Sequence, residues 1–270
     1  MIISVSRRCD IPRYNFDWFI ERLNEGFVDV ANPYNASQIK RISLNCTDVN
    51  AFVFWTRNPE NILANADELI KRGFPFYVMV SLTGYPGVLE PNQASVPEVI
   101  SCMKKLAQKI GQGRVIWRYD PVILTSITDK DFHKHNFSEL AQNMSDFVRR
   151  IIISIYDKYQ KAQKRLYELE KAGELQMQNV DEKELHGLLA DFAKCAKAVG
   201  MEIQSCAEKE DFSFLGIKPG ACIDAELVKK NCGAEFARDK NQRPDCLCCR
   251  STDIGSYGTC KAQCVYCYAC

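Results

Sequence analysis

The chain has 270 residues, of which 46% are hydrophobic and 26% are charged, a composition typical of a globular protein with one large domain or two small ones. Lysine and arginine total 35 against 34 acidic residues, and the net charge of +1 gives no indication of a protein that binds nucleic acid. The sequence shows neither an N-terminal signal peptide nor the run of about 20 apolar residues that would span a membrane. We therefore expect a cytoplasmic protein.

Short segments rich in Val, Ile, Phe, Tyr or Trp alternate with helical patterns along the first 210 residues. The strands are expected at residues 2–6, 51–56, 76–82, 114–119, 151–156 and 201–206. Clear helical patterns cover residues 61–71, 97–110 and 184–199, each followed by a glycine. This alternation predicts a parallel α/β sheet, and six such units favour a partial (β/α)6 TIM-like barrel over residues 1–210.

Two further segments depart from this alternation. Residues 157–184 mix Lys, Arg and Glu in helical register and predict a solvated helix and turn without a function. Residues 211–270 are rich in Gly, Pro, Cys and Asp, which predicts a cysteine-rich iron–sulfur region packed on the mouth of the barrel.

Cysteine is the outlier of the composition, with 14 residues, most of them between Cys206 and Cys270. In a reducing cytoplasm, clustered cysteines indicate metal ligands rather than disulfides. Cys260, Cys264 and Cys267 have the spacing C-x3-C-x2-C, with Tyr266 just before the third cysteine. Three thiolates at this spacing can hold a 4Fe–4S cluster and leave its fourth iron open to a small molecule.

This motif resembles the cluster loop of the radical S-adenosylmethionine (radical SAM) enzymes. In those enzymes the loop normally lies near the N-terminus, whereas here it closes the chain. The resemblance implies a 4Fe–4S cluster at Cys260, Cys264 and Cys267, with S-adenosylmethionine as a second cofactor.

A second set of cysteines lies upstream of this motif. Four of them would hold an auxiliary, fully ligated cluster, but the spacing does not decide which four. The candidates are Cys206, Cys222, Cys232, Cys246, Cys248 and Cys249. A rival arrangement is a structural zinc ribbon, which would leave Cys260 unexplained and would use Cys246, Cys248, Cys264 and Cys267. Cys232, Cys249 and Cys270 are idle thiols or replacement ligands in this interpretation.

Polar residues follow the ends of the predicted strands, where a parallel α/β barrel places its ligand site. We expect contacts to the cofactor or substrate from Arg57, Arg118, Asp120 and Glu208. S-adenosylmethionine offers a carboxylate to arginine and an ammonium group to an acidic residue. Alternatively, Arg57, Arg118 and Asp120 pair with one another at a polar rim. No catalytic residue is predicted, and no hydrolytic arrangement of Ser, His and Asp is present.

The whole chain resembles an uncharacterised domain-of-unknown-function family of bacterial and archaeal proteins with a C-terminal radical-SAM-type cysteine cluster. The matching motifs lie at residues 6–12, 53–59, 117–121, 205–208, 221–224, 239–243, 246–248 and 253–255, and in the terminal cysteines. The resemblance implies that the auxiliary ligands are Cys206, Cys222, Cys246 and Cys248. The chain departs from the family pattern at Cys9, where threonine is usual, and at the additional Cys249. It also ends at Cys270, where related chains usually continue.

The leading hypothesis is a radical SAM enzyme that abstracts hydrogen from an unknown substrate and takes electrons from a flavodoxin or ferredoxin. The alternative is a non-catalytic iron–sulfur or zinc protein with a structural or redox-sensing role. Repair of damaged nucleic acid, by analogy with radical SAM lyases, is a third idea that the near-zero net charge does not support.

Overall fold

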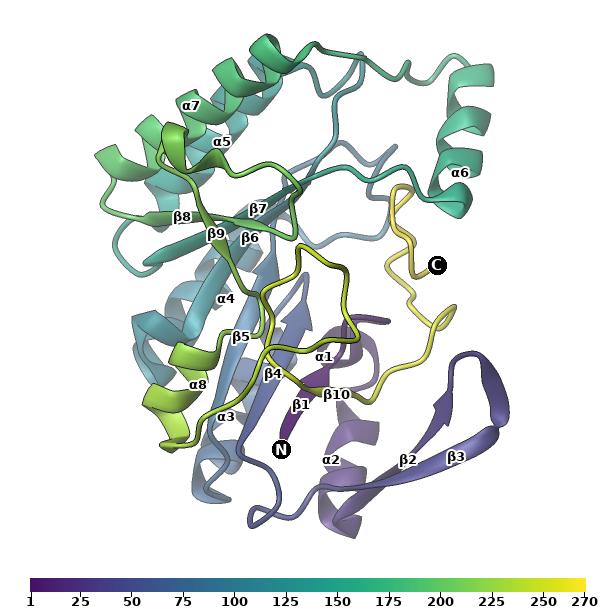
Figure 1. Ribbon diagram of the computed structural model, residues 1–270, viewed down its shortest axis with the longest axis vertical. Coiled ribbons are helices and arrows are strands. Elements are labelled where there is room, and N and C mark those ends of the chain that lie inside the picture. The colour runs from purple at the N-terminus through teal and green to yellow at the C-terminus, as the bar shows by residue number, and fades with distance from the viewer.

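A parallel sheet of eight strands forms the centre of the protein in a computed structural model that describes residues 1–270 (Figure 1). Its order is β10-β1-β4-β5-β6-β7-β8-β9. The six central strands confirm the six predicted ones and are β1 (Ile2–Val5), β4 (Ala51–Thr56), β5 (Phe76–Ser81), β6 (Val115–Val122), β7 (Arg150–Ile155) and β8 (Glu202–Cys206).

The two outer strands come from the cysteine-rich region. β9 (Lys218–Gly220) pairs with β8, and β10 (Thr252–Asp253) pairs with β1, both in parallel. β9 and β10 do not pair with each other, so the sheet does not close into a barrel. The parallel α/β architecture is confirmed, and the sheet extends at both edges beyond the six predicted strands.

Eight α-helices surround the sheet, and those expected from the sequence are present as α3, α4, α7 and, within the charged 157–184 segment, α6. Their full bounds are α1 (Ile11–Tyr14), α2 (Phe16–Glu25), α3 (Glu60–Lys71), α4 (Val96–Ile110), α5 (Lys130–Met144), α6 (Gln160–Lys171), α7 (Glu182–Ala198) and α8 (Ala225–Cys232). Capping boxes fix the starts of α4, with Ser95 and Glu98, and of α7, with Asp181 and Glu184.

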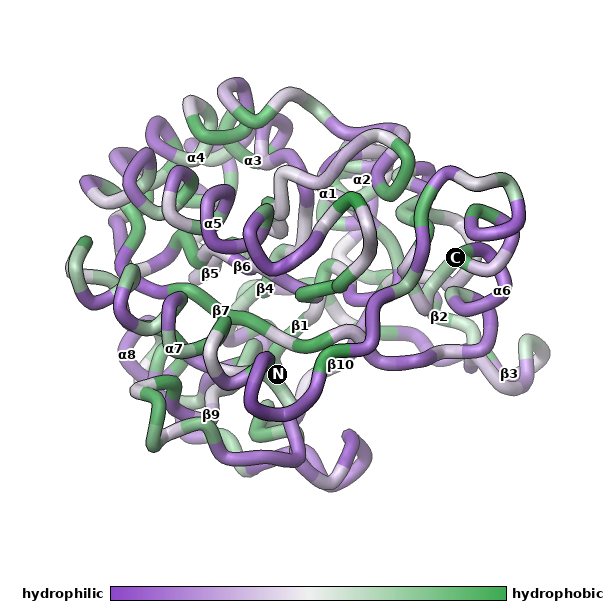
Figure 2. Tube along the Cα trace, turned by 90° about the horizontal axis from the view of Figure 1, so that it is seen from above, coloured by the Kyte–Doolittle hydropathy of each residue, from purple (hydrophilic) through white to green (hydrophobic).

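The two faces of the sheet pack against different partners, as strand β4 shows. Phe52 and Phe54 point to the larger core, where both contact Phe19 of α2 at ring-centroid distances of 5.3 and 5.5 Å. The alternate residues Val53 and Trp55 belong to a second core, which contains cysteines of the C-terminal region. The apolar strands lie at the centre of the molecule in Figure 2. Residues 222–249 of the cysteine-rich segment therefore cover the sheet face opposite α2, whereas Ile254, Cys264 and Tyr266 belong to the larger core.

A hairpin of β2 (Phe27–Asn32) and β3 (Asn35–Ser43) interrupts the connection from β1 to β4 and was not predicted. It projects from the rest of the protein in Figure 1, and most residues of β3 are exposed. Such a strand lacks the apolar alternation by which half-buried strands are found in a sequence. None of the helices combines the length and the apolar character that a bilayer-spanning helix needs.

Phe54→Ala should lower the free energy of unfolding by about 3–5 kcal/mol, because it empties a space enclosed by aromatic rings. The matched control is Phe214→Ala, since the Phe214 side chain is 66% exposed. The control should cost about 0.5 kcal/mol or less. Urea unfolding of both variants measures the difference, and equal losses would contradict the assignment of Phe54 to the core.

Candidate functional site

A cavity of about 830 Å³ opens at the carboxyl ends of the sheet strands. This volume is within the range of small-molecule binding sites. Residues at the ends of six strands line it: Ser6, Thr56, Ser81, Asp120, Ser154 and Cys206. The C-terminal segment completes the wall. All seven cysteines predicted as metal ligands line this one cavity: Cys206, Cys222, Cys246, Cys248, Cys260, Cys264 and Cys267.

The upstream thiol group consists of Cys206, Cys222, Cys246 and Cys248. The Sγ atoms of Cys206 and Cys222 lie 3.1 Å apart, and Cys248 forms thiol contacts with both Cys222 and Cys246. These contacts and the backbone N–H of Ile223, 3.3 Å from the Cys248 Sγ, lower the pKa of the Cys248 thiol. The structure thus brings together the four cysteines that the family resemblance implies.

The terminal thiol group consists of Cys260, Cys264, Cys267 and one cysteine that the prediction left out, Cys270. The Cys270 thiol contacts both Cys260 and Cys267. Hydrogen bonding from Cys270 lowers the pKa of Cys260 to about 6 and that of Cys267 to about 7. Cys264 is buried beside them, with Gln93 Nε2 3.5 Å from its Sγ.

Both groups present converging sulfur donors, the chemistry that 4Fe–4S clusters and zinc prefer. The thiol contacts join Cys246 and Cys248 to the upstream group and Cys267 to the terminal group. No thiol contact connects these two sets. The geometry therefore favours two separate sites over the zinc ribbon that would combine Cys246, Cys248, Cys264 and Cys267.

Helix α6 holds the loop of the terminal thiol group through the guanidinium of Arg165. Its Nε donates to the Val265 carbonyl at 2.9 Å, its Nη1 donates to the Cys270 carbonyl at 3.2 Å, and its Nη2 donates to the Cys267 carbonyl. Figure 1 shows α6 beside the C-terminal segment. The charged 157–184 segment, to which the sequence assigned no function, thus contains the residue that shapes the loop.

The carboxylate of Asp253, on β10, fixes the C-terminal segment to β1. It accepts hydrogen bonds from Ser4 Oγ at 2.7 Å, from Ser6 Oγ at 2.6 Å and from the Arg7 backbone N–H at 2.8 Å. The guanidinium groups of Arg7 and Arg8 lie 3.8 and 3.9 Å from it. These bonds hold the β1 turn and the terminal thiol segment on the same side of the cavity.

Arg57 lines the cavity, but its charge is already paired. Its guanidinium forms an ion pair with buried Glu90 and donates to Thr83 Oγ1 at 2.8 Å. Tyr266, between two cysteines of the terminal group, donates its hydroxyl hydrogen to the same Glu90 carboxylate. This geometry makes Arg57 a positioning residue for the cysteine loop. Glu90 has no local sequence signal, because it lies on an irregular segment before α4.

Arg118 and Asp120 pair with each other, as the polar-rim alternative predicts, whereas Arg57 pairs with Glu90 and not with Asp120. Arg118 also lies over the Trp55 ring, 4.8 Å from its centroid. The Trp55 Nε1–H is buried without a hydrogen-bond partner. An unpaired donor at the wall of this cavity suits an acceptor atom on a bound group.

Glu208 follows β8 but is not part of the cavity wall. Its carboxylate accepts a hydrogen bond from the Ile155 backbone N–H at 2.8 Å. Burial raises the pKa of Glu208 to about 7, and the charges of Asp157 and Asp120 add to this increase.

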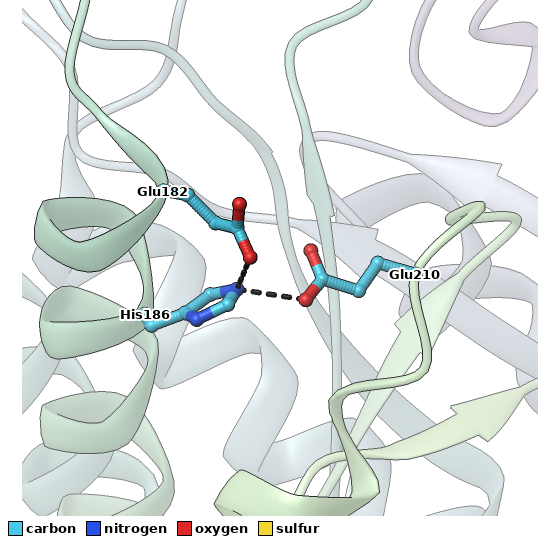
Figure 3. Close-up of side chains that lie close together, drawn as sticks. All are labelled: Glu182, His186 and Glu210. Atoms are coloured by element: carbon cyan, nitrogen blue, oxygen red, sulfur yellow. Dashed lines mark ion pairs between the residues drawn. The ribbon is translucent and has the colours of Figure 1, made fainter.

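The histidines lie outside the cavity. His133 is buried between the Tyr119 hydroxyl, at 2.8 Å, and the Ile123 carbonyl, at 3.0 Å, and burial lowers its pKa to about 4. His186 of α7 lies between Glu210, 2.8 Å away, and Glu182, 4.0 Å away (Figure 3). Glu182 and Glu210 are exposed, and both carboxylates face the His186 ring.

Fold and cavity together define a parallel α/β protein with two groups of cysteine thiols at the carboxyl ends of its strands. The chain belongs to the family described as a domain of unknown function, DUF1848, which matches residues 2–269. The predicted membership in an uncharacterised domain family is thereby confirmed. No curated protein matches this chain.

Among solved structures, this chain is similar to the crystal structure of "a putative alpha-L-fucosidase" from Bacteroides thetaiotaomicron. The sequence identity is 10% and the TM-score 0.32, and the likeness covers 71% of this chain and 74% of that chain. At this level the likeness carries no argument about function.

Asp253→Asn should lower the free energy of unfolding by about 3 kcal/mol, because it leaves the arginines at the β1 turn without their carboxylate. The matched control is Asp245→Asn, an exposed position in the same segment, which should cost about 0.5 kcal/mol or less. Equal urea unfolding curves for the two variants would show that Asp253 does not anchor the segment.

The raised pKa of Glu208 predicts a pH-dependent stability. The folded state binds this proton more tightly than the unfolded state, in which the pKa is 4.5. The stabilisation is complete below pH 4.5 and is lost as the pH rises through about 7. Between these limits the wild type should lose about 3 kcal/mol relative to Glu208→Gln.

Urea unfolding at several pH values measures this difference. Glu174→Gln, at an exposed position, is the control and should keep the pH dependence of the wild type. A Glu208→Gln profile parallel to that of the wild type would contradict the raised pKa.

Proposed function

We propose that this protein is a radical SAM enzyme, with a 4Fe–4S cluster at Cys260, Cys264 and Cys267. An auxiliary cluster would be held by Cys206, Cys222, Cys246 and Cys248. The observation that carries the proposal is that both thiol groups line one cavity at the carboxyl ends of a parallel sheet. A cofactor and a substrate bound in this cavity would lie next to both groups.

The cysteines at C-x3-C-x2-C spacing supply three thiolates for a cluster with an open iron. When bound, such a cluster would supply the electron for reductive cleavage of S-adenosylmethionine and thereby the chemistry for abstracting hydrogen from the substrate. The chain's part is to hold and orient the reactants and to keep water away from them.

Several cavity residues fit that part. Asp120 accepts a hydrogen bond from Ser154 Oγ at 2.7 Å and pairs with Arg118, so both are held in place before a ligand arrives. The unpaired Trp55 Nε1–H offers one directional donor. Arg57 pairs with Glu90, which also binds the Tyr266 hydroxyl and so positions the cysteine loop. Glu208 lies outside the cavity wall and holds the end of β7 through its hydrogen bond from the Ile155 N–H. A flavodoxin or ferredoxin in the cytoplasm would supply the electrons.

One observation favours a second candidate, a non-catalytic redox or structural metal protein. The terminal group contains four thiols rather than three, because Cys270 contacts Cys260 and Cys267. Four cysteines can close a metal site completely, as in structural zinc sites and electron-transfer clusters.

Removal of two cysteines from one group tests the two-cluster arrangement after anaerobic reconstitution, because only two thiolates of that group then remain. The wild type should bind about eight irons, and the double variants Cys260→Ala/Cys264→Ala and Cys246→Ala/Cys248→Ala should each retain about four. S-adenosylmethionine should change the electron paramagnetic resonance (EPR) spectrum of the reduced Cys246→Ala/Cys248→Ala protein but not that of Cys260→Ala/Cys264→Ala. Deoxyadenosine should form only when the terminal cysteines are present.

The matched control is Cys249→Ala, because Cys249 is buried next to Cys248 but lies outside both thiol groups. It should keep the full iron content. Zinc in place of iron, or a wild-type spectrum that S-adenosylmethionine does not change, would favour the non-catalytic candidate.

A further inference from the structure

Cys270 extends the terminal motif to C-x3-C-x2-C-x2-C. Its thiol contacts Cys260 and Cys267, the first and third cysteines of the motif, and it lines the same cavity. Three thiols would be enough for a cluster with an open iron, so the fourth needs its own explanation.

The backbone holds Cys270 in this place. The Arg165 guanidinium donates to the Cys270 carbonyl at 3.2 Å and also to the Cys267 carbonyl. The backbone N–H of Ala269 donates to Cys267 Sγ at 3.3 Å, and the Ala269 carbonyl accepts from the Gly258 N–H at 2.9 Å. The loop is therefore fixed on both sides, with the Cys270 thiol directed to the other cysteines.

Cys9 is the other cysteine near this group, and it is bound differently. It lines the cavity, but its thiol hydrogen-bonds with Thr259 and the Ser256 backbone and forms no hydrogen bond with the thiols of the terminal group. Cys270 is thus the cysteine whose contacts match those of a fourth ligand.

We infer that the Cys270 thiolate is the fourth protein ligand of the terminal cluster. This inference rests on the proposed presence of that cluster.

If the protein is a radical SAM enzyme, S-adenosylmethionine must displace this thiolate. The bond between the iron and Cys270 Sγ then breaks, a bond from the cofactor to the same iron forms, and the released thiolate takes a proton from solvent. No electron is transferred in this exchange. Until the cofactor arrives, Cys270 would protect the iron from loss.

The first test compares the wild type, Cys270→Ala and Cys9→Thr after anaerobic reconstitution of the full chain. A cluster with an open iron loses that iron to a mild oxidant such as ferricyanide and gives the EPR signal of a 3Fe–4S cluster. We expect this signal to form readily in Cys270→Ala, whereas the wild type and Cys9→Thr should keep all four irons of the terminal cluster and give little of the signal. The auxiliary cluster has four thiolates and should not contribute.

The second measurement is a titration with S-adenosylmethionine, followed by the EPR spectrum of the reduced protein. If the thiolate occupies the iron in nine of ten molecules, half-saturation should occur at roughly tenfold lower concentration in Cys270→Ala. Equal iron loss and equal half-saturation in the wild type and Cys270→Ala would overturn the inference and leave the proposed function intact. A second outcome is that S-adenosylmethionine changes the EPR spectrum of neither protein, while iron loss still depends on Cys270. This outcome would support Cys270 as the fourth ligand and overturn the proposed function.

A third measurement needs no variant and so does not depend on the folding of Cys270→Ala. Iodoacetamide labelling of the wild type, read by mass spectrometry, is compared with and without the reconstituted cluster. Cluster formation should protect Cys270 to the same extent as Cys260 and Cys267, while exposed Cys46 is labelled in both forms. Labelling of Cys270 at the same rate in both forms would overturn the inference.

Discussion

The arrangement of the site depends on the attachment of the C-terminal segment to the first strand by Asp253. Hydrogen bonds from Ser4, Ser6 and Arg7 reach one carboxylate across almost the whole length of the chain. The backbone N–H of Ile254 continues the pairing by donating to the Ser4 carbonyl at 3.1 Å. Because a charge-assisted hydrogen bond is roughly twice as strong as a neutral one, this small contact can hold an otherwise irregular segment in place. Without it, the cavity would lack the wall that contains the terminal thiol group.

The arginines of the cavity face carboxylates before any ligand binds, and Arg7 and Arg8 share that of Asp253. Arg57 pairs with Glu90, Arg118 with Asp120, and Arg243 with Asp157. A buried guanidinium without such a partner would carry a large desolvation cost. These pairs produce fixed dipoles around the thiols, and fixed dipoles need no rearrangement when charge appears on a bound group. The cavity wall is therefore polar and rigid, with little net charge.

The sequence predicted those parts of the fold whose signals are local. The strands of the sheet core are continuous apolar runs, and helices α3, α4 and α7 have glycines and caps at their ends. The hairpin of β2 and β3 was not predicted, because its residues are mostly polar. β9 and β10 were not predicted, because each is only two or three residues long and is defined by its pairing with a neighbouring strand.

The same distinction applies to the site. Spacing identified the cysteines of the terminal motif, and the family resemblance selected the upstream four. The roles of three residues, Arg165, Glu90 and Asp253, could not be predicted in this way, because each binds residues more than 30 positions away in the sequence. The fourth thiol, Cys270, fits no three-cysteine pattern and was set aside as an idle or replacement thiol, although its spacing was visible.

The pairing of β10 with β1 also sets an order of events during synthesis. The first strand leaves the ribosome at the start of translation, but the partner for its outer edge is made only when residues 252–253 appear. The cysteines of the terminal motif follow within the next twenty residues. Most of the sheet can therefore assemble while one edge stays unpaired, and the terminal thiol group can come together only after residues 252–270 have been made. A cell that makes this protein would need to shield that edge until residues 252–253 are made, since an unpaired strand edge is a site of aggregation.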